Sequence, residues 1–202
     1  GASALMQGLA DGYFVLPYTI GDYLSNDIKT GKVNTNTQPF EDAERAVKEF
    51  ILNISKNKSG NSVDHYHKKL GKIMWDKCGM SRNEKDLKQA INDIRELRKD
   101  FYGNVVIPGE TNSYNEELAK AGRVADFLEL GELFAIDALE RKESCGGHFR
   151  EEYQTEEGEA LRNDAEYAFV SCWEFMGIDK RPKLNKEELH FESIELKSRS
   201  YK

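Results

Sequence analysis

A thiol and an imidazole lie close together in this sequence and could act on one substrate. Cys145 and His148 fall within Glu143-Ser-Cys-Gly-Gly-His-Phe-Arg-Glu-Glu-Tyr153, and a cysteine beside a histidine can form a nucleophilic thiolate–imidazole pair. Such a pair also needs oxyanion donors and a third group that orients the imidazole, and the sequence shows neither. We therefore interpret Cys145 as a free structural thiol and this stretch as a polar turn after a helix.

Other polar groups are poorly placed for catalysis or for metal binding. His65 and His67 are two residues apart, so on a helix their imidazoles point to different faces. We read the pairs Glu151-Glu152 and Glu156-Glu157 as solvated carboxylates. The glycines that could cradle a phosphate instead interrupt or end predicted helices: Gly71, Gly79 and Gly103. The residues alone predict no catalytic residue and no metal site.

Length and charge restrict the class of protein. The 202 residues suffice for one large or two small domains, and the net charge is −7. Basic residues are spread along the predicted helices, which argues against nucleic acid as a partner. Three cysteines without a C-x-x-C spacing indicate free thiols in a reducing compartment. No run of about 18 apolar residues is present, so we predict no membrane-spanning segment.

The elements that would position these groups begin with a helix and a linker. Residues 3–24 predict a helix with apolar residues on one face, and residues 25–36 read as a polar linker. The chain begins with Gly1 instead of an initiator methionine, so we expect it to be a piece of a longer protein.

Residues 37–145 predict a helical bundle domain. One helix begins at Thr37, with Phe40, Ala43, Val47, Phe50 and Ile54 as its packing face. A second covers residues 62–78, and a third runs from a capping box at Ser81-Arg-Asn-Glu84 to Gly103. The longest covers residues 116–143, with Arg141 and Lys142 in its last turn and Gly146-Gly147 ending it. Its apolar residues cover more than one stripe, as in a central helix.

Residues 146–202 predict a region that contains β structure. Alternating aromatic residues predict a strand over residues 167–176, with one face formed by Tyr167, Phe169, Trp173 and Phe175. A second strand over residues 189–196 would pair with it as a hairpin. The predicted fold class is mainly α: an antiparallel three-to-four-helix bundle, spectrin-repeat-like, with a small C-terminal β-hairpin.

Two stretches resemble a known family. They are Leu70-Gly-Lys-Ile-Met-Trp-Asp-Lys-Cys-Gly-Met-Ser-Arg-Asn-Glu84, and the long predicted helix ending in Arg141-Lys-Glu-Ser-Cys-Gly-Gly-His-Phe-Arg-Glu-Glu-Tyr153. Together they resemble the C-terminal part of the flavoprotein subunit of succinate dehydrogenase and fumarate reductase, to which L-aspartate oxidase is related. Cys145 stands where that family usually has arginine. Arg199-Ser-Tyr201 also resembles the family's ending.

The resemblance implies where a cofactor would bind. Residues 1–5 fall on the family's Arg-Leu-Gly-Gly-Asn-Ser-Leu motif, whose arginine binds the dicarboxylate and whose following residues face the flavin. Ala4 and Leu5 would then bind FAD through backbone N–H groups, only in a full-length parent, and Ala4 replaces the family's serine. The family's catalytic residues lie upstream. We therefore expect no catalytic residue, no metal and no bound cofactor in this piece.

The resemblance also implies a function. Residues 1–30 would be the tail of the FAD-binding domain, residues 37–145 the helical domain and residues 146–202 the terminal region. The parent would interconvert succinate and fumarate and pass electrons to an iron–sulfur subunit and a quinone. The implied partners are the FAD-binding domain of the same chain, the iron–sulfur subunit and, indirectly, a membrane anchor subunit. The location would be cytoplasmic and peripheral at the inner face of the cell membrane.

Two alternative identities of the chain remain open. The chain could be a stand-alone helical interaction module or the C-terminal part of a soluble L-aspartate oxidase. As a piece of the succinate dehydrogenase or fumarate reductase flavoprotein subunit, by contrast, it would be a scaffold and subunit interface that is inactive when isolated. Residues 1–24 carry more apolar surface than a free terminus normally exposes, so we expect them to fold back or to self-associate in a non-native way.

Overall fold

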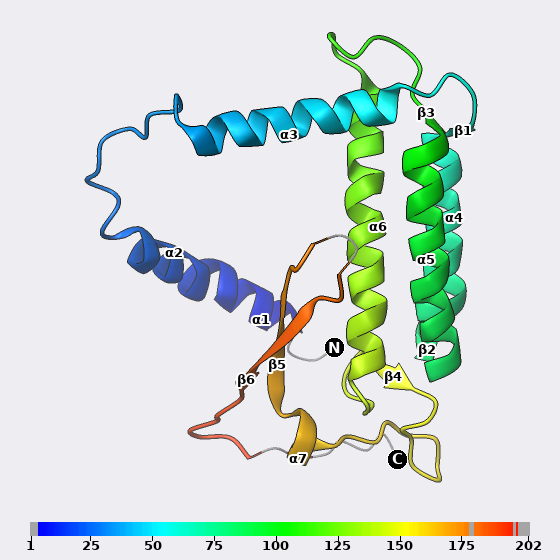
Figure 1. The fold of residues 1–202 in the computed structure, drawn as a ribbon. Coiled ribbons are helices and arrows are strands. Elements are labelled where there is room, and N and C mark those ends of the chain that lie inside the picture. Colours follow the sequence, from blue (N-terminus) through cyan, green and yellow to red (C-terminus); the bar gives the residue numbers. More distant parts are fainter. Residues whose placement is uncertain (1–3, 178–179, 196, 198–202) are drawn as a thin grey trace. The chain divides into compact units, whose positions relative to one another are not determined.

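The computed structural model describes residues 4–177, 180–195 and 197 (Figure 1). These residues form two compact units, Gly1–Ala46 and Val47–Lys202. Most of the regular structure is helical and the strands are short, so the predicted mainly α fold class is confirmed. The predicted division into residues 1–30, 37–145 and 146–202 stays a prediction.

The first unit contains one nearly continuous helical segment. It consists of α1 (Ala4–Ala10), a π-helical turn η1 (Asp11–Val15) and α2 (Leu16–Leu24), close to the predicted 3–24. The π turn precedes Pro17, which lacks the N–H that an uninterrupted α-helix would require there. α3 (Gln38–Ser55) begins in this unit and continues into the second.

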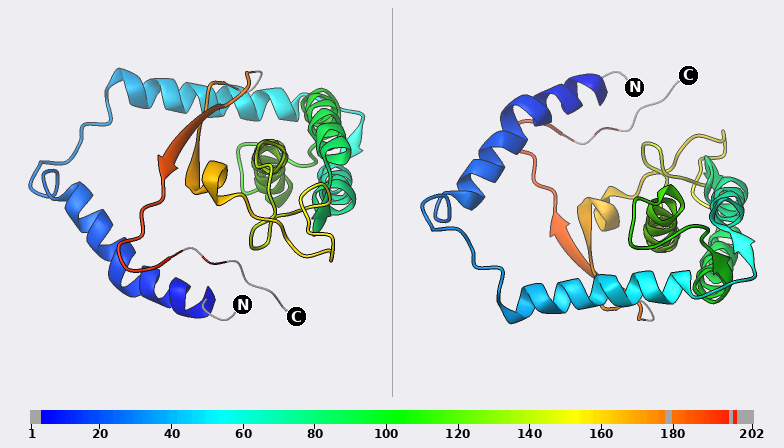
Figure 2. Two further views of the ribbon diagram at one scale, coloured as in Figure 1. Left: turned by 90° about the horizontal axis from the view of Figure 1, so that it is seen from below. Right: turned by 90° about the horizontal axis from the view of Figure 1, so that it is seen from above.

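Three helices form the bundle of the second unit. α4 (Val63–Cys78), α5 (Glu84–Asn104) and α6 (Glu116–Glu140) lie side by side and alternate in direction, and Figure 2 shows them end-on. One core cluster surrounds Tyr66, Phe101 and Leu128. A second cluster surrounds Leu87 and Ala135, nearer to the end where α4 and α6 terminate.

Two very short parallel pairings tie segments that are distant in the sequence. β1 (Asn61–Ser62) pairs with β3 (Val105–Val106). At the opposite end of the bundle, β2 (Ser81–Arg82) pairs with β4 (Phe149–Arg150). Each pairing therefore lies at an end of the bundle, where helices begin or finish.

The terminal region adds a short helix and an antiparallel hairpin. α7 (Asp164–Tyr167) leads into β5 (Phe169–Glu174), which pairs with β6 (Lys183–Glu188). The hairpin was predicted, but its second strand was misplaced at residues 189–196. The polar sequence of β6 can form a strand because its side chains are exposed or half-buried and it needs only backbone partners. Tyr167 closes α7 instead of opening the strand, and Leu196 lies outside the described residues.

Three predicted helix boundaries were wrong. Asn83, not Ser81, caps α5, because the Asn83 side chain accepts a 2.8 Å hydrogen bond from the Asp86 N–H while Ser81 lies in β2. Gly103 lies inside α5, which ends where Val105 becomes extended. α6 ends at Glu140 because Arg141 has an extended backbone with ψ of 102°.

Two predicted packing faces are only partly buried. On α3, Ile54 is fully buried and Phe50 packs beside it, whereas Val47 is exposed. On α6, Leu130 and Phe134 are exposed, so this helix is not covered on every side.

Candidate functional site

The two stretches that carry the family resemblance meet at one end of the bundle. In the β2–β4 pairing Ser81 lies opposite Phe149, and Arg82 lies opposite Arg150. The Glu151 N–H extends this pairing with a 2.8 Å hydrogen bond to the Arg82 carbonyl oxygen. Two sequence motifs therefore form one polar junction, which we define as Arg82, Arg141, Ser144, His148 and Arg150 with their partners.

Arg150 is the most deeply buried cation of the polar junction, with 1% of its surface exposed. Its Nη1 donates to the carbonyl oxygens of Ala138 at 2.9 Å and Leu139 at 3.3 Å, in the last turn of α6. Those carbonyls have no partner within the helix. The backbone N–H of Arg150 donates to Ser144 Oγ at 2.8 Å, which holds the arginine in place. A cation from a later segment thus caps α6.

Arg82 has the same role at the end of α4. Its Nε donates to the carbonyl oxygens of Cys78 at 3.3 Å and Gly79 at 2.9 Å. Its guanidinium also lies over the Phe134 ring, 4.9 Å from the centroid, and so contacts α6.

His148 connects Arg82 with the end of α6. Arg82 Nη1 lies 3.0 Å from His148 Nδ1, and because arginine can only donate, Nδ1 accepts. The proton therefore lies on Nε2, which donates to the Arg141 carbonyl oxygen at 3.0 Å. Burial lowers the pKa of His148, and the charges of Arg82, Arg150 and Arg141 lower it further against the opposing effect of the carbonyl. The imidazole is neutral at pH 7.

Arg141 links the end of α6 to the hairpin. Its Nη1 donates to Glu143 Oε1 at 2.7 Å and to the Tyr167 carbonyl oxygen at 3.2 Å. Its Nη2 donates to the Phe169 carbonyl oxygen at 3.0 Å. Glu143, which is 2% exposed, also accepts a 2.8 Å hydrogen bond from the Asn163 N–H. This ion pair orders the chain between α6 and β5.

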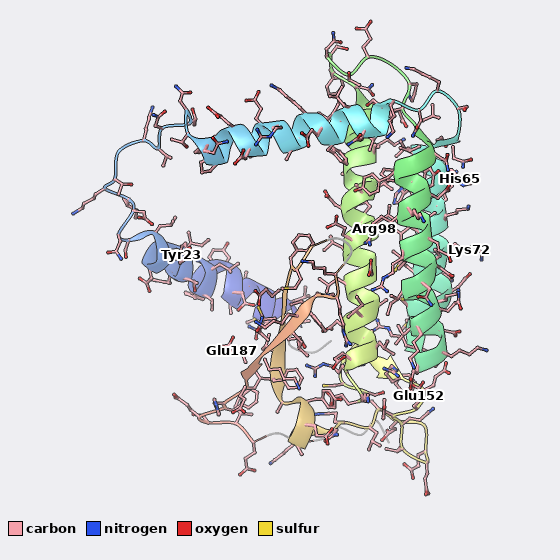
Figure 3. The ribbon with its side chains drawn as sticks, in the orientation of Figure 1. Tyr23, His65, Lys72, Arg98, Glu152 and Glu187 are labelled. Atoms are coloured by element: carbon pink, nitrogen blue, oxygen red, sulfur yellow. The ribbon has the colours of Figure 1, made fainter. Side chains whose placement is uncertain are left out.

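The carboxylates after β4 hold the start of α5, although Glu151 and Glu152 are exposed, as predicted. Glu151 accepts hydrogen bonds from Ser81 Oγ at 2.9 Å and from Asn83 Nδ2 at 3.3 Å. Glu152, labelled in Figure 3, accepts one from the Glu84 N–H in the first turn of α5. Burial raises the pKa of Glu152, but these backbone N–H groups and Arg150 outweigh it and lower the pKa. The spacing in sequence gave no sign of this contact.

A cavity of about 260 Å³ adjoins the polar junction beside the half-buried Cys145. Cys145 and His148 are joined through their backbones, with N···O distances of 2.8 and 3.0 Å. Both ring nitrogens of His148 contact other groups, so its imidazole is engaged away from the thiol. Burial raises the pKa of Cys78, which keeps that thiol protonated.

His65 and His67 on α4 are not part of this junction. The His65 ring contacts Tyr66 and the His67 ring contacts Phe127. Among the residues that the structure describes, no three metal-ligating side chains gather. Ala4 and Leu5 form the first turn of α1, which carries no acidic side chain. Residues 1–3 and Arg199-Ser-Tyr201 lie outside the described part.

The family model described as "Fumarate reductase flavoprotein C-term" matches residues 67–201. The chain is 25% identical over 177 residues to the fumarate reductase flavoprotein subunit of Helicobacter pylori strain J99, covering 88% of this chain and 24% of the relative. It is 32% identical over 112 residues to an uncharacterized FAD-dependent oxidoreductase of Methanocaldococcus jannaschii, covering 55% of this chain and 20% of that protein.

Solved structures show the same fold. A quinol–fumarate reductase with menaquinol has a TM-score of 0.70 at 22% identity, covering 89% of this chain and 30% of that one. Mycobacterium smegmatis Sdh1 in complex with UQ1 has a TM-score of 0.64 at 24% identity, and the match covers 84% of this chain and 26% of that one. The chain spans about a quarter of the length of the first curated relatives. None of the described helices has the length and apolarity needed to cross a membrane.

Proposed function

This chain belongs to the fumarate reductase flavoprotein C-terminal family, and we propose that it is the scaffold part of a longer flavoprotein that interconverts succinate and fumarate. In that protein the flavin accepts or supplies hydride, and electrons pass to an iron–sulfur subunit and a quinone. The residues described here supply a rigid bundle and no reacting group.

The polar junction is the observation that supports a scaffold role. Arg82 and Arg150 donate to helix-end carbonyls, and His148 joins Arg82 to the Arg141 carbonyl. These side chains, which carry the family motifs, therefore use their hydrogen bonds to close helices. Because these side chains are already hydrogen-bonded to the backbone or to one another, they stabilise the fold and are poorly placed to transfer protons to a substrate.

The proposed flavin contact is at the start of α1. The backbone N–H groups of Ala4 and Leu5 would donate to the flavin in the full-length parent, which needs no particular side chain. The proposed partners are the FAD-binding domain of the same chain, the iron–sulfur subunit and, through it, a membrane anchor subunit. The proposed location is cytoplasmic and peripheral at the membrane.

Two measurements test this function. The purified 202-residue chain is expected to be colourless and to lack succinate:acceptor activity, because Ala4 and Leu5 alone cannot hold a flavin. Stoichiometric flavin in its visible spectrum would contradict the scaffold assignment.

The gene upstream of residue 1 should encode a Gly-x-Gly-x-x-Gly strand–helix unit. A gene that encodes these residues alone would instead favour a stand-alone interaction module.

Co-purification distinguishes a respiratory flavoprotein from the remaining alternative, a soluble L-aspartate oxidase. A respiratory flavoprotein should be recovered from its source together with an iron–sulfur protein, whereas an L-aspartate oxidase should not. The matching family model and the fumarate reductase relatives support the respiratory assignment.

A further inference from the structure

A large groove runs along α5 and α6 and is also lined by Arg181, which precedes β6. Its volume is about 1100 Å³. Cationic side chains line it, and Ile91, Ile136 and Leu139 contribute apolar surface. Arg98, labelled in Figure 3, lies between α5 and α6. We call this the α5–α6 groove.

The α5–α6 groove is positively charged although the chain is acidic overall. Four cationic side chains line it or reach into it, Arg95, Arg98, Lys99 and Arg181, against two nearby carboxylates. Both oxygens of one carboxylate, Glu132, are bound, by Arg95 Nε at 2.7 Å and by Arg98 Nη1. The other, Glu140, accepts from Arg181 Nη2 at 3.1 Å. Among the described residues, no carboxylate pairs with Lys99.

The spacing of the cations suits a polypeptide. Arg95 and Lys99 are one helical turn apart, about 6 Å along the axis. Carboxylates at alternate positions of an extended peptide are about 6.6 Å apart, and those at i and i+4 of a helix are about 6 Å apart. The nearby apolar residues Ile91 and Ile136 would contact aliphatic side chains between the acids. A small inorganic anion would fill little of this volume.

We propose that the α5–α6 groove docks an acidic, amphipathic peptide segment of a partner protein. Carboxylates of the segment pair with Lys99, Arg95 and Arg181, while its leucine-like side chains cover Ile91, Ile136 and Leu139. This inference rests on the groove alone and stands independently of the proposed function.

The test uses the full 202-residue chain and a fluorescein-labelled peptide of sequence Glu-Leu-Leu-Glu-Glu-Leu-Leu-Glu, followed by fluorescence anisotropy. The peptide should bind saturably, and raising the salt from about 50 to 300 mM should weaken binding several-fold. K99E and R181E should each weaken binding at least tenfold. The matched control K85E reverses an exposed lysine on the same helix outside the groove and should bind as the unaltered chain does.

Several results would overturn the proposal. Unchanged affinity in both K99E and R181E would place the peptide elsewhere, and an equal loss in K85E would show only a general charge effect. Equal binding of the peptide with glutamine in place of glutamate would exclude the charge pairing. Binding of tripolyphosphate without binding of the peptide would make the groove an inorganic anion site. A dimer in sedimentation that K99E dissociates would make a second copy the occupant.

Discussion

At the scale of single residues, the cations at the end of the bundle act on backbone carbonyls. The Arg150 guanidinium is almost completely buried and contacts two carbonyl oxygens of the last turn of α6, while Arg82 does the same for α4. Lysine at these positions would carry the charge but not the planar set of donors. This geometry explains why these two positions hold arginine and not lysine.

Replacement of Arg150 should destabilise the fold strongly. Arg150→Met leaves the Ala138 and Leu139 carbonyls without a donor in a buried place, so the free energy of unfolding should fall by about 3 kcal/mol or more. Urea denaturation measures this loss. Arg181→Met is the matched control, because that side chain is 74% exposed and its ion pair contributes at most about 1 kcal/mol. Equal losses in the two variants would refute the capping role.

His148 should make stability depend on pH. Its pKa is lowered in the folded chain, so below the unfolded value of about 6.5 the unfolded state binds more protons. The free energy of unfolding should therefore fall as pH drops below about 6.5, by at most about 1.4 kcal/mol per pH unit for this group. In His148→Gln this contribution should disappear. Denaturation curves between pH 7.5 and 5.5 provide the comparison, and His190→Gln, on an exposed side chain, is the control. Parallel curves for His148→Gln and the unaltered chain would contradict the assignment.

At the scale of elements, one side-chain contact fixes the hairpin on α6. Trp173 Nε1 on β5 donates to Asp137 Oδ1 on α6 at 2.7 Å, and the Trp173 side chain packs against the second core cluster. Arg141 reinforces the attachment at the base of the hairpin. The hairpin therefore depends on α6 for its position.

Trp173→Phe should loosen this attachment. The ring can still pack, but the hydrogen bond to Asp137 is lost, so the free energy of unfolding should drop by about 1–2 kcal/mol. Trp75→Phe is a natural control because Trp75 is 83% exposed, and it should change stability by less than about 0.5 kcal/mol. In that control variant Trp173 is the sole tryptophan, so its fluorescence reports the hairpin directly. A larger loss for Trp75→Phe would reverse the assignment.

The sequence predicted the helices well and their ends less well. Apolar periodicity located α4, α5 and α6, because burial of one face determines where such helices form. α6 nevertheless stops at Glu140, where capping by Arg150 competes with further helix. Because Arg150 lies in a later segment, the sequence pattern within α6 does not predict this cap. The position of β6 was missed for a similar reason, because its register depends on backbone pairing with β5 and not on apolar alternation.

At the scale of the whole molecule, the first unit exposes an unusual amount of apolar surface. Large apolar side chains of α1, η1 and α2 are exposed, among them Leu5 at 89%, Met6 at 66%, Tyr13 at 70% and Phe14 at 69%. Each such side chain forgoes about 1.5–3 kcal/mol of burial. Surface of this kind is normally covered by another polypeptide.

Removal of this segment should therefore change the behaviour of the chain in solution. We expect residues 1–24 to be covered by another copy or by the remainder of the same chain. A version beginning at Gly31 should either lose self-association in light scattering or remain a monomer with a lower melting temperature. Identical mass and melting temperature in the two versions would show that the segment is inert.

The pairing of β2 with β4 also bears on the order of folding. The side-chain contacts beside it join residues as far as 70 positions apart, Ser81 and Glu151, although the ladder is only two residues long. The helices between them form through local contacts, whereas this closure must first overcome the entropy of a long loop. The helices should thus assemble early and the closure should form last. In hydrogen exchange the amide of Glu151 should open before those in the middle of α5, so this end of the bundle is where unfolding begins.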